Sequence, residues 1–234
     1  MSTTIYSSLS GAKAAWTEME MVSNNLANAT SDGFKAHRLA LKSQRVSDEA
    51  LGNSYVKVAE TVSDMSDGTL ATTGVETHLA LRGRGFFVVE GEEGPVLQRS
   101  GNFSIDAEGR LVNQRGQRVL TESGPLEIPD RERMIIDQDG VVRTDQGGEV
   151  GRLRLVDSQE VSPIGHGQWR SDGPTVSVNG VVKVIQGSLE KSNVDPMRAM
   201  VELMEASRYF ESYQKAIQTT DELDGKANEI MRSR

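Results

Sequence analysis

The chain has 234 residues, 36% of them apolar and 5% aromatic, which is enough for one large domain or two small ones with their own cores. Its formal net charge of −8, from 34 acidic and 26 basic residues without a dense basic cluster, excludes nucleic acid as an expected partner. The absence of cysteine excludes disulfides, thiolate catalysis and sulfur-ligated metals.

The chain opens with a predicted amphipathic helix over residues 3–28. Its apolar side chains recur in alternating steps of four and three, with Ser23 as the one polar member, and no glycine or proline interrupts the series after Gly11. The series consists of Ile5, Leu9, Ala12, Trp16, Met19 and Leu26. The first residues lack the cationic start and apolar middle of a secretory signal, and no apolar run approaches the roughly 20 residues of a membrane helix. We therefore expect a soluble protein that is either cytoplasmic or exported without a cleaved signal peptide.

Residues 37–74 are polar and are predicted to form an extended, irregular connector with some strand character around Tyr55 to Val62. From 75 to 187, short segments rich in Val, Ile and Phe alternate with turn residues, which is typical of an all-β domain. The segments 106–109, 139–140 and 179–180 have the composition of hairpin turns.

Residues 188–234 are predicted to end the chain with a second long helix. Asp195 followed by Pro196 favours a helix start, since Asp can accept free amide hydrogens and Pro suits the first helical position. The four-and-three spacing returns in Leu203, Ala206, Phe210, Tyr213, Ile217, Thr220, Ala227 and Met231. The predicted fold class is thus α+β, with a long helix at each end, a connector and a central all-β domain.

Both apolar seams must be buried, because each large side chain left in water forgoes about 1.5–3 kcal/mol. One alternative is that the two helices pair with each other within a monomer. Such a pair buries one side of each helix, so it would leave several large side chains partly exposed. These are Trp16, Met21, Val22, Met200 or Met204. Further partners are therefore expected.

Catalytic and ligand-binding patterns are weak. The three histidines, His37, His78 and His166, are far apart and lack metal-ligand spacing. The segment at 83–87, GRGFF, lacks the third glycine of a dinucleotide loop and leads into a strand. The DQDG segment at 137–140 lacks the remaining ligands of a calcium loop and favours a hairpin. We expect no enzymatic activity, no cofactor, no metal and no small-molecule substrate.

Three segments, in this order, resemble the family of bacterial flagellar rod and hook proteins. The first is the Ser-x-Asn-Leu-Ala-Asn core at 23–28, followed by Ser31, Gly33, Phe34 and Lys35. The second comprises residues 67–90 and 97–120, which look like the start of the β domain of that family. The third, 189–228, is similar to its C-terminal helix. It matches at Ser192, Asn193, Val194, Asp195, Met200, Val201, Arg208, Glu211, Lys215, Asp221, Glu222, Ala227 and Asn228. Departures are Asp32, where the family usually has Thr, and His78, where an Asp often stands.

The resemblance implies a structural subunit of the flagellar basal-body rod, the drive shaft that transmits torque from motor to hook. The terminal helices (1–36 with its turn motif, and 188–234) would form a coiled-coil-like inner layer through head-to-tail contacts that do not close, with the β domain outside. Implied partners are other copies, other rod proteins and the type III export apparatus, with hook-side and surrounding ring proteins left open. The single β domain excludes the hook protein, which carries extra outer domains. The slightly short chain, the brief connector after Lys35 and the segments RGRGFFVVE and ASRYFESYQKAI favour a proximal rod protein over a distal one.

The resemblance also places the assembly interface on the two seams and on the turn after the first helix. The expected interface residues are Ile5, Leu9, Ala12, Trp16, Met19, Asn24, Asn25, Leu26, Asn28, Gly33, Phe34, Leu203, Ala206, Phe210, Tyr213, Ile217 and Ala227. Gly33 is expected in a left-handed turn, Asn24 and Asn25 as hydrogen-bonding groups between subunits, and Phe34 as an anchor. Two alternatives remain. The asparagines form an ordinary helix end in a monomer, or the chain is a non-flagellar enzyme or adhesin whose helices only dimerise it.

Overall fold

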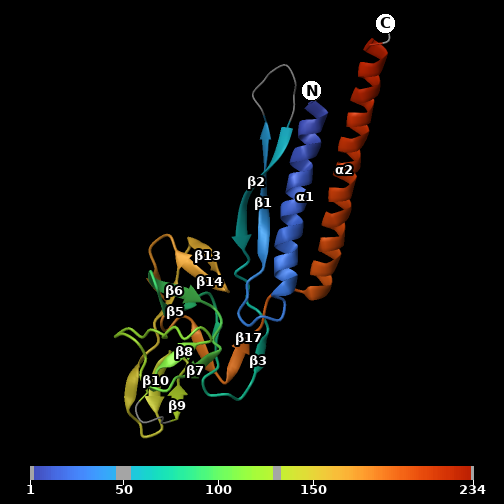
Figure 1. Ribbon diagram of the computed structural model, residues 1–234. Helices are drawn as coiled ribbons and strands as arrows, with labels where there is room; N and C mark the ends of the chain where they lie inside the picture. The colour runs from blue at the N-terminus through green and yellow to red at the C-terminus, as the bar shows by residue number, and fades with distance from the viewer. Residues whose placement is uncertain (1–2, 46–53, 129–132, 233–234) are drawn as a thin grey trace. The chain divides into compact units, whose positions relative to one another are not determined.

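The computed structural model describes residues 3–45, 54–128 and 133–232, without the side chains of 3–6, 41–45, 54–60, 224 and 227–232 (Figure 1). The fold is α+β, as predicted, with a helix near each end of the chain and a largely β central region. The helices are α1 (Thr3–Ala27) and α2 (Pro196–Arg232). The strands are β1 (His37–Arg45), β2 (Ser54–Ser63), β3 (Leu70–Thr72), β4 (Leu79–Arg82), β5 (Phe86–Gly91), β6 (Gly94–Gln98), β7 (Phe103–Ile105), β8 (Leu111–Asn113), β9 (Met134–Ile136), β10 (Val141–Thr144), β11 (Glu149–Arg152), β12 (Leu155–Asp157), β13 (Val161–Gly165), β14 (Gln168–Ser171), β15 (Val176–Ser177), β16 (Lys183–Gln186) and β17 (Ser188–Glu190).

The chain divides into two compact units. Unit 1 comprises the described residues of 1–29, 36–64 and 194–234, and unit 2 comprises those of 30–35 and 65–193. The predicted β domain, 75–187, lies within unit 2, but 65–74 and 188–193 belong to that unit as well.

Unit 1 is built from the two helices and one β hairpin, with α1 packed against both α2 and the hairpin (Figure 1). The helix start predicted at Asp195 is confirmed. Its carboxylate accepts hydrogen bonds from the amides of Met197 (2.9 Å) and Arg198 (3.3 Å), two of the donors that a helix start leaves free. Neither helix is long and apolar enough, within the described residues, to cross a membrane.

The segment predicted as an irregular connector contains a long β hairpin, in which β2 confirms the strand character expected around Tyr55 to Val62. β1 and β2 pair antiparallel from His37 opposite Ser63 to Arg45 opposite Ser54, with one bulge between Ala40 and Leu41. Residues 39–41 are all apolar and show no alternation with polar residues, and the pairing joins residues that the sequence separates by up to 26 positions. The long range of this pairing explains why the local sequence pattern does not predict the hairpin.

Unit 2 is all-β. Its largest sheet has six antiparallel strands in the order β13-β14-β6-β5-β12-β15, beside a three-stranded sheet, β11-β10-β9. The pairs β16-β4, β17-β3 and β7-β8 complete the unit. The predicted turn at 137–140 is confirmed, with Gly140 at φ 78° and the Asp137 carboxylate accepting from the amide of Val141. Residues 179–180 also turn, but they link β15 and β16, which pair with other strands.

The core of unit 2 lies on both faces of β5. Phe87 and Val89 point into the larger apolar cluster, whereas Phe86 and Val88 point into a smaller one that contains Trp169. Side chains alternate across a strand, so a strand buried on both faces reads as the continuous apolar run FFVV.

Candidate assembly interface

A seam of small and aromatic side chains holds α1 and α2 together. Gly11 on α1 leaves no room for a side chain, because a Cβ there would lie 2.5 Å from ring carbons of Tyr213 on α2. Farther along α1, the rings of Trp16 and Phe210 have centroids 5.5 Å apart and are tilted against each other. Since the later α1 residue meets the earlier α2 residue, the helices run antiparallel. The buried alanines of the two helices are Ala12, Ala15, Ala199 and Ala206.

α2 carries two apolar faces. The predicted series forms the face toward α1. Leu203, Ala206, Phe210, Tyr213 and Ile217 are buried or half-buried at steps of three and four. The side chain of Ala227, and that of Ile5 on α1, lie outside the described residues.

The second face of α2 lies about half a turn around the helix from the first, given 3.6 residues per turn. It consists of Met197, Met200, Val201 and Met204, whose exposed fractions are 72%, 46%, 49% and 55%. These positions follow the i, i+3, i+4, i+7 pattern of one helix stripe. We call them the methionine stripe.

The predicted series on α1 is only partly covered. Ala12 is buried and Met19 and Leu26 are half-buried, but Leu9 is 55% and Trp16 49% exposed. Leu9 and Trp16 are seven residues, or about two helical turns, apart, so they lie on the same face of α1. We call these two side chains the α1 patch.

The buried line of α1 runs instead through Ala15, Val22 and Asn25. The expectation that Val22 stays partly exposed is wrong, since it is 1% exposed. The physical reason is that α1 packs against the β1–β2 hairpin as well as α2, which moves the buried line around the helix. Trp16, Met200 and Met204 are exposed, as predicted for a helix pair without further partners.

The asparagines at the end of α1 divide into two roles. Asn25 is buried and exchanges two hydrogen bonds with the backbone of His37, each 2.8 Å long. It is therefore engaged within its own chain, and its expected role between subunits stays a prediction. Asn24 is exposed, and its carbonyl accepts from the backbone and side-chain amides of Asn28 at 3.1 and 2.9 Å, as at an ordinary helix end.

The turn after α1 belongs to unit 2. Gly33 adopts the predicted left-handed conformation (φ 69°) and donates to the Glu190 carbonyl at 2.7 Å. A Cβ on Gly33 would lie 2.4 Å from the backbone nitrogen of Ser100, so glycine is required for space as well as for conformation. Phe34 is buried, and Asp32 pairs with Lys191 at 2.7 Å.

A buried ionic cluster holds this turn in unit 2. The Lys35 Nζ donates to Glu190 Oε1 at 2.7 Å, and the Arg99 Nε donates to Glu190 Oε2 at 2.5 Å. The amide of Gly68 donates to the same carboxylate at 2.8 Å. All three charged side chains are at most 3% exposed. The remaining guanidinium nitrogens of Arg99 donate to the carbonyls of Leu81, Gly83 and Gly85 and to the carboxylate of Asp67.

The cluster keeps Glu190 charged. Burial by itself raises the pKa of this carboxyl, but the charge of Arg99 and the hydrogen bonds from Lys35 and Gly68 outweigh it, so the pKa lies below its ordinary value. With both carboxylate oxygens occupied by groups of the chain, the cluster serves to fix the segments 30–35, 66–68 and 188–190 rather than to bind a ligand.

Two of these features are not among those predicted from the sequence. Met200 and Met204 are predicted to be partly exposed, but the helical spacing that places them in one stripe with Met197 and Val201 is a further signal that the prediction did not include. The ionic cluster joins residues 91 and 155 positions apart, which no local pattern reveals. Lys35 lies within the first of the segments that resemble the family, and Glu190 within the third. Their place in these segments is the one sequence feature that indicates their importance.

The rival enzyme hypothesis requires a convergent pocket, and unit 2 has one groove with acidic and imidazole groups. It has a volume of about 470 Å³ and is lined by Glu92, Glu93, His166, Arg115 and Arg170 among others. Glu92, Glu93 and His166 are all exposed, whereas catalytic acids and bases are commonly buried to shift their pKa values. Within the described residues no group of three or more His, Asp or Glu could hold a metal ion.

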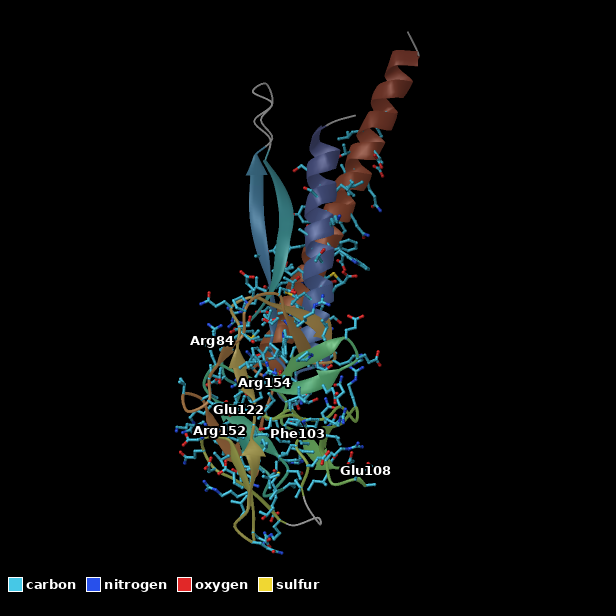
Figure 2. All side chains as sticks on the ribbon, turned by 90° about the vertical axis from the view of Figure 1, so that its left-hand side faces the viewer. Arg84, Phe103, Glu108, Glu122, Arg152 and Arg154 are labelled. Atoms are coloured by element: carbon cyan, nitrogen blue, oxygen red, sulfur yellow. The ribbon has the colours of Figure 1, made fainter. Side chains whose placement is uncertain are left out.

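A second charged surface of unit 2 is equally open. Figure 2 shows Arg84, Glu122, Arg152 and Arg154 on it, and all four side chains are exposed. Glu122 and Arg152 are neighbours, because the Glu122 amide donates to the Arg152 carbonyl at 3.0 Å. The unit therefore offers mixed surface charge without an enclosed reactive group, which does not favour the enzyme hypothesis.

Three family profiles match successive parts of the chain. Residues 5–35 match "Flagella basal body rod protein", residues 80–144 match "Flagellar hook protein FlgE/F/G D1 domain", and residues 185–230 match "Flagellar basal body rod FlgEFG protein C-terminal". The matched ranges include α1, the turn at Gly33, the ionic residues Lys35, Arg99 and Glu190, and most of α2.

Individual relatives are similar over nearly the whole chain. The flagellar basal-body rod protein FlgF of Salmonella typhimurium is 30% identical over 245 residues, covering 97% of this chain and 97% of the relative. FlgF of Caulobacter vibrioides is 33% identical over 241 residues, with 98% of each chain covered. The rod protein FlgG of Bacillus subtilis is 32% identical over 252 residues, covering 94% of this chain and 95% of the relative.

Proposed function

Since this chain belongs to the family of flagellar basal-body rod proteins, we propose that it builds the rod by packing α1 and α2 against neighbouring subunits. It is a structural subunit of the rod. The two helices would supply a coiled-coil-like inner layer, and torque would pass through many such subunit contacts at once.

The observation that carries this proposal is the amount of large apolar side chain left in water on the helices of unit 1. Leu9, Trp16 and the methionine stripe are each about half exposed or more. Covering them would recover part of the roughly 1.5–3 kcal/mol that burial of each such side chain is worth. Head-to-tail contacts that do not close would then extend the assembly along one axis.

Both rod types among the relatives fit this chain. The names FlgF and FlgG occur at 30–33% identity and with nearly complete coverage. We propose the proximal type, on the resemblance of the segments RGRGFFVVE and ASRYFESYQKAI, with the distal type as the alternative. In either case the role is structural rather than enzymatic. We further propose that other rod proteins are its partners, and that it reaches the flagellum through the type III export apparatus.

The test is the Leu9→Asp variant of the full chain in flagellated cells. A charge in the α1 patch opposes burial in a subunit contact, so we expect the variant to be missing from isolated basal bodies and the cells to lose motility. Ser7→Asp is the matched control, because Ser7 is also exposed but lies on the opposite face of α1.

Ile217→Asp tests the seam between the helices, where Ile217 is half-buried, and should abolish incorporation as well. In both Asp variants the fluorescence of buried Trp169 should report a folded unit 2. Motile cells with normal rods that contain either Asp variant would contradict the proposal.

A further inference from the structure

We infer that the methionine stripe of one copy docks on the α1 patch of a second copy of this chain. The inference rests on the proposed function and adds to it the two surfaces that meet and the nature of the partner. Neither surface is the predicted seam of α2, which is already used between the two helices of one copy.

The two surfaces cannot cover each other within one copy. The α1 patch borders the helix seam, since Trp16 contacts Phe210 on the inner face of α2. The methionine stripe lies on the opposite, outer face of that helix. A helix separates them, so one copy presents both surfaces outward at the same time.

The surfaces match in length. The stripe runs from Met197 to Met204 and the α1 patch from Leu9 to Trp16, so the two ends of each lie seven positions apart, or roughly 10 Å along the helix. Beyond Met204 the same face of α2 continues with Arg208 and therefore becomes charged. The apolar contact available on α2 is thus two turns long, like the one on α1.

The surfaces also match in chemistry. Methionine side chains are flexible and polarisable, and they make favourable contacts with aromatic rings such as Trp16. Exposed Lys13 lies between Leu9 and Trp16 on α1, whereas exposed Glu205 borders the stripe on α2. Lys13 and Glu205 thus offer one pair of opposite charges for a contact between the stripe and the α1 patch.

Contact between two different surfaces of identical copies is heterologous, so each added copy presents the same pair of surfaces again. A second copy is the occupant that explains why both surfaces occur on one chain. Another rod protein on the stripe is the competing outcome that the test must distinguish.

The test is disulfide cross-linking in isolated basal bodies, which this chain suits because it has no cysteine of its own. Four double variants combine Leu9→Cys or Trp16→Cys with Met197→Cys or Met204→Cys. If α1 of one copy packs antiparallel to α2 of the next, position 9 lies near 204 and position 16 near 197. If the two helices pack parallel, position 9 lies near 197 and position 16 near 204. We expect the two variants that belong to one packing direction to give a ladder of covalent multimers. Their ladder should be about tenfold stronger than that of the other two variants, which corresponds to a preference of about 1.4 kcal/mol for that direction.

The control double variant is Ser7→Cys with Ser212→Cys, two exposed positions away from both surfaces, and it should give no ladder. The inference is overturned if the stripe cross-links to a different protein or if the cross-links form within single copies. It is also overturned by equal ladders in all variants, or by the absence of a ladder although the variants are present in basal bodies. Absence of a ladder from assembled variants leaves the proposed function standing. Absence of the unmodified chain from basal bodies would instead overturn the proposed function.

Discussion

Lys35 donates a 2.7 Å hydrogen bond to the buried carboxylate of Glu190, which follows it by 155 positions in the chain. Arg99 binds the other oxygen of that carboxylate, so a single side chain ties three distant segments of unit 2 together. Because both cations are buried with it, neutralising this carboxylate leaves the Lys35 ammonium without its anionic partner and Arg99 with only the half-exposed carboxylate of Asp67.

We therefore expect Glu190→Gln to destabilise unit 2 by about 3–5 kcal/mol, the cost of breaking a buried ion pair from one side. Urea unfolding of the full chain, followed by Trp169 fluorescence in a Trp16→Phe background, measures this loss. Glu205→Gln is the control. Glu205 is exposed, so its change should stay within about 0.5 kcal/mol. A loss below about 1 kcal/mol for Glu190→Gln would show that the cluster is not a structural lock.

The same carboxylate predicts a response to acid. The pKa of Glu190 is lower in the folded chain than in the unfolded chain, so its contribution is fully present above the unfolded value of about 4.3 and is lost as the pH falls through the folded value. The stability of unit 2 should therefore fall more steeply with acid in the wild type than in Glu190→Gln. Urea midpoints at successive pH values below about 5 compare the two. Parallel curves would contradict the assignment.

His37 predicts a second pH response, in unit 1. Burial lowers the pKa of its imidazole, so the folded chain holds it neutral more strongly than the unfolded chain does. Stability is present above the unfolded pKa of about 6.5 and is lost as the pH falls through the lower folded value. Thermal unfolding followed by circular dichroism at 222 nm should show a lower midpoint at about pH 5 than at pH 7, with a smaller difference in His37→Gln. An equal difference in that variant would assign the effect elsewhere.

Gly33 and Gly116 form a matched pair for the turn after α1. Both have positive φ, 69° and 75°, but a Cβ would strike the Ser100 backbone at Gly33 and meets nothing within 4 Å at Gly116. Gly116→Ala should cost about 1 kcal/mol for the left-handed conformation alone. Gly33→Ala should cost at least about 3 kcal/mol, because the backbone must also move. Urea unfolding of both variants measures the difference, and equal costs would refute the spatial argument.

Asn25 and Asn24 form a second matched pair, at the end of α1. Asn25→Ala removes both hydrogen bonds between the buried Asn25 side chain and the backbone of His37, which should cost about 2 kcal/mol. Asn24→Ala changes an exposed helix position and should be within about 0.5 kcal/mol. Thermal unfolding at 222 nm measures both, and faster hydrogen exchange of the His37 amide in Asn25→Ala locates the effect. Similar costs for the two variants would mean that the paired hydrogen bonds contribute little.

Structural features that depend on residues close together in the chain were predictable from the sequence. The seam of α2 from Leu203 to Ile217 follows helical periodicity, and its start follows from the short range over which Asp195 can cap a helix. The turn at Gly140 and the left-handed Gly33 likewise depend on their own residues. In each case the relevant interaction joins residues a few positions apart, or concerns one backbone conformation.

Features decided by distant partners were not predictable in this way. Whether α1 buries Trp16 or Val22 depends on the direction from which α2 and the hairpin approach, because both side chains are apolar and lie on neighbouring faces. The β1–β2 hairpin and the Glu190 cluster depend on pairings across the chain. Family resemblance indicated that Lys35 mattered, but only the folded chain identifies its partner.

Ser66 and Asn193 lie at the two ends of the long unit 2 segment, and the Asn193 side chain donates to the Ser66 carbonyl at 3.2 Å. The segment therefore leaves its flanking chain and returns to it at one place, like a loop with a closed neck. Insertions in loops between these two ends should leave the ends themselves side by side. Exchange of the whole β unit would have to preserve its contacts with residues 30–35, which belong to the same unit.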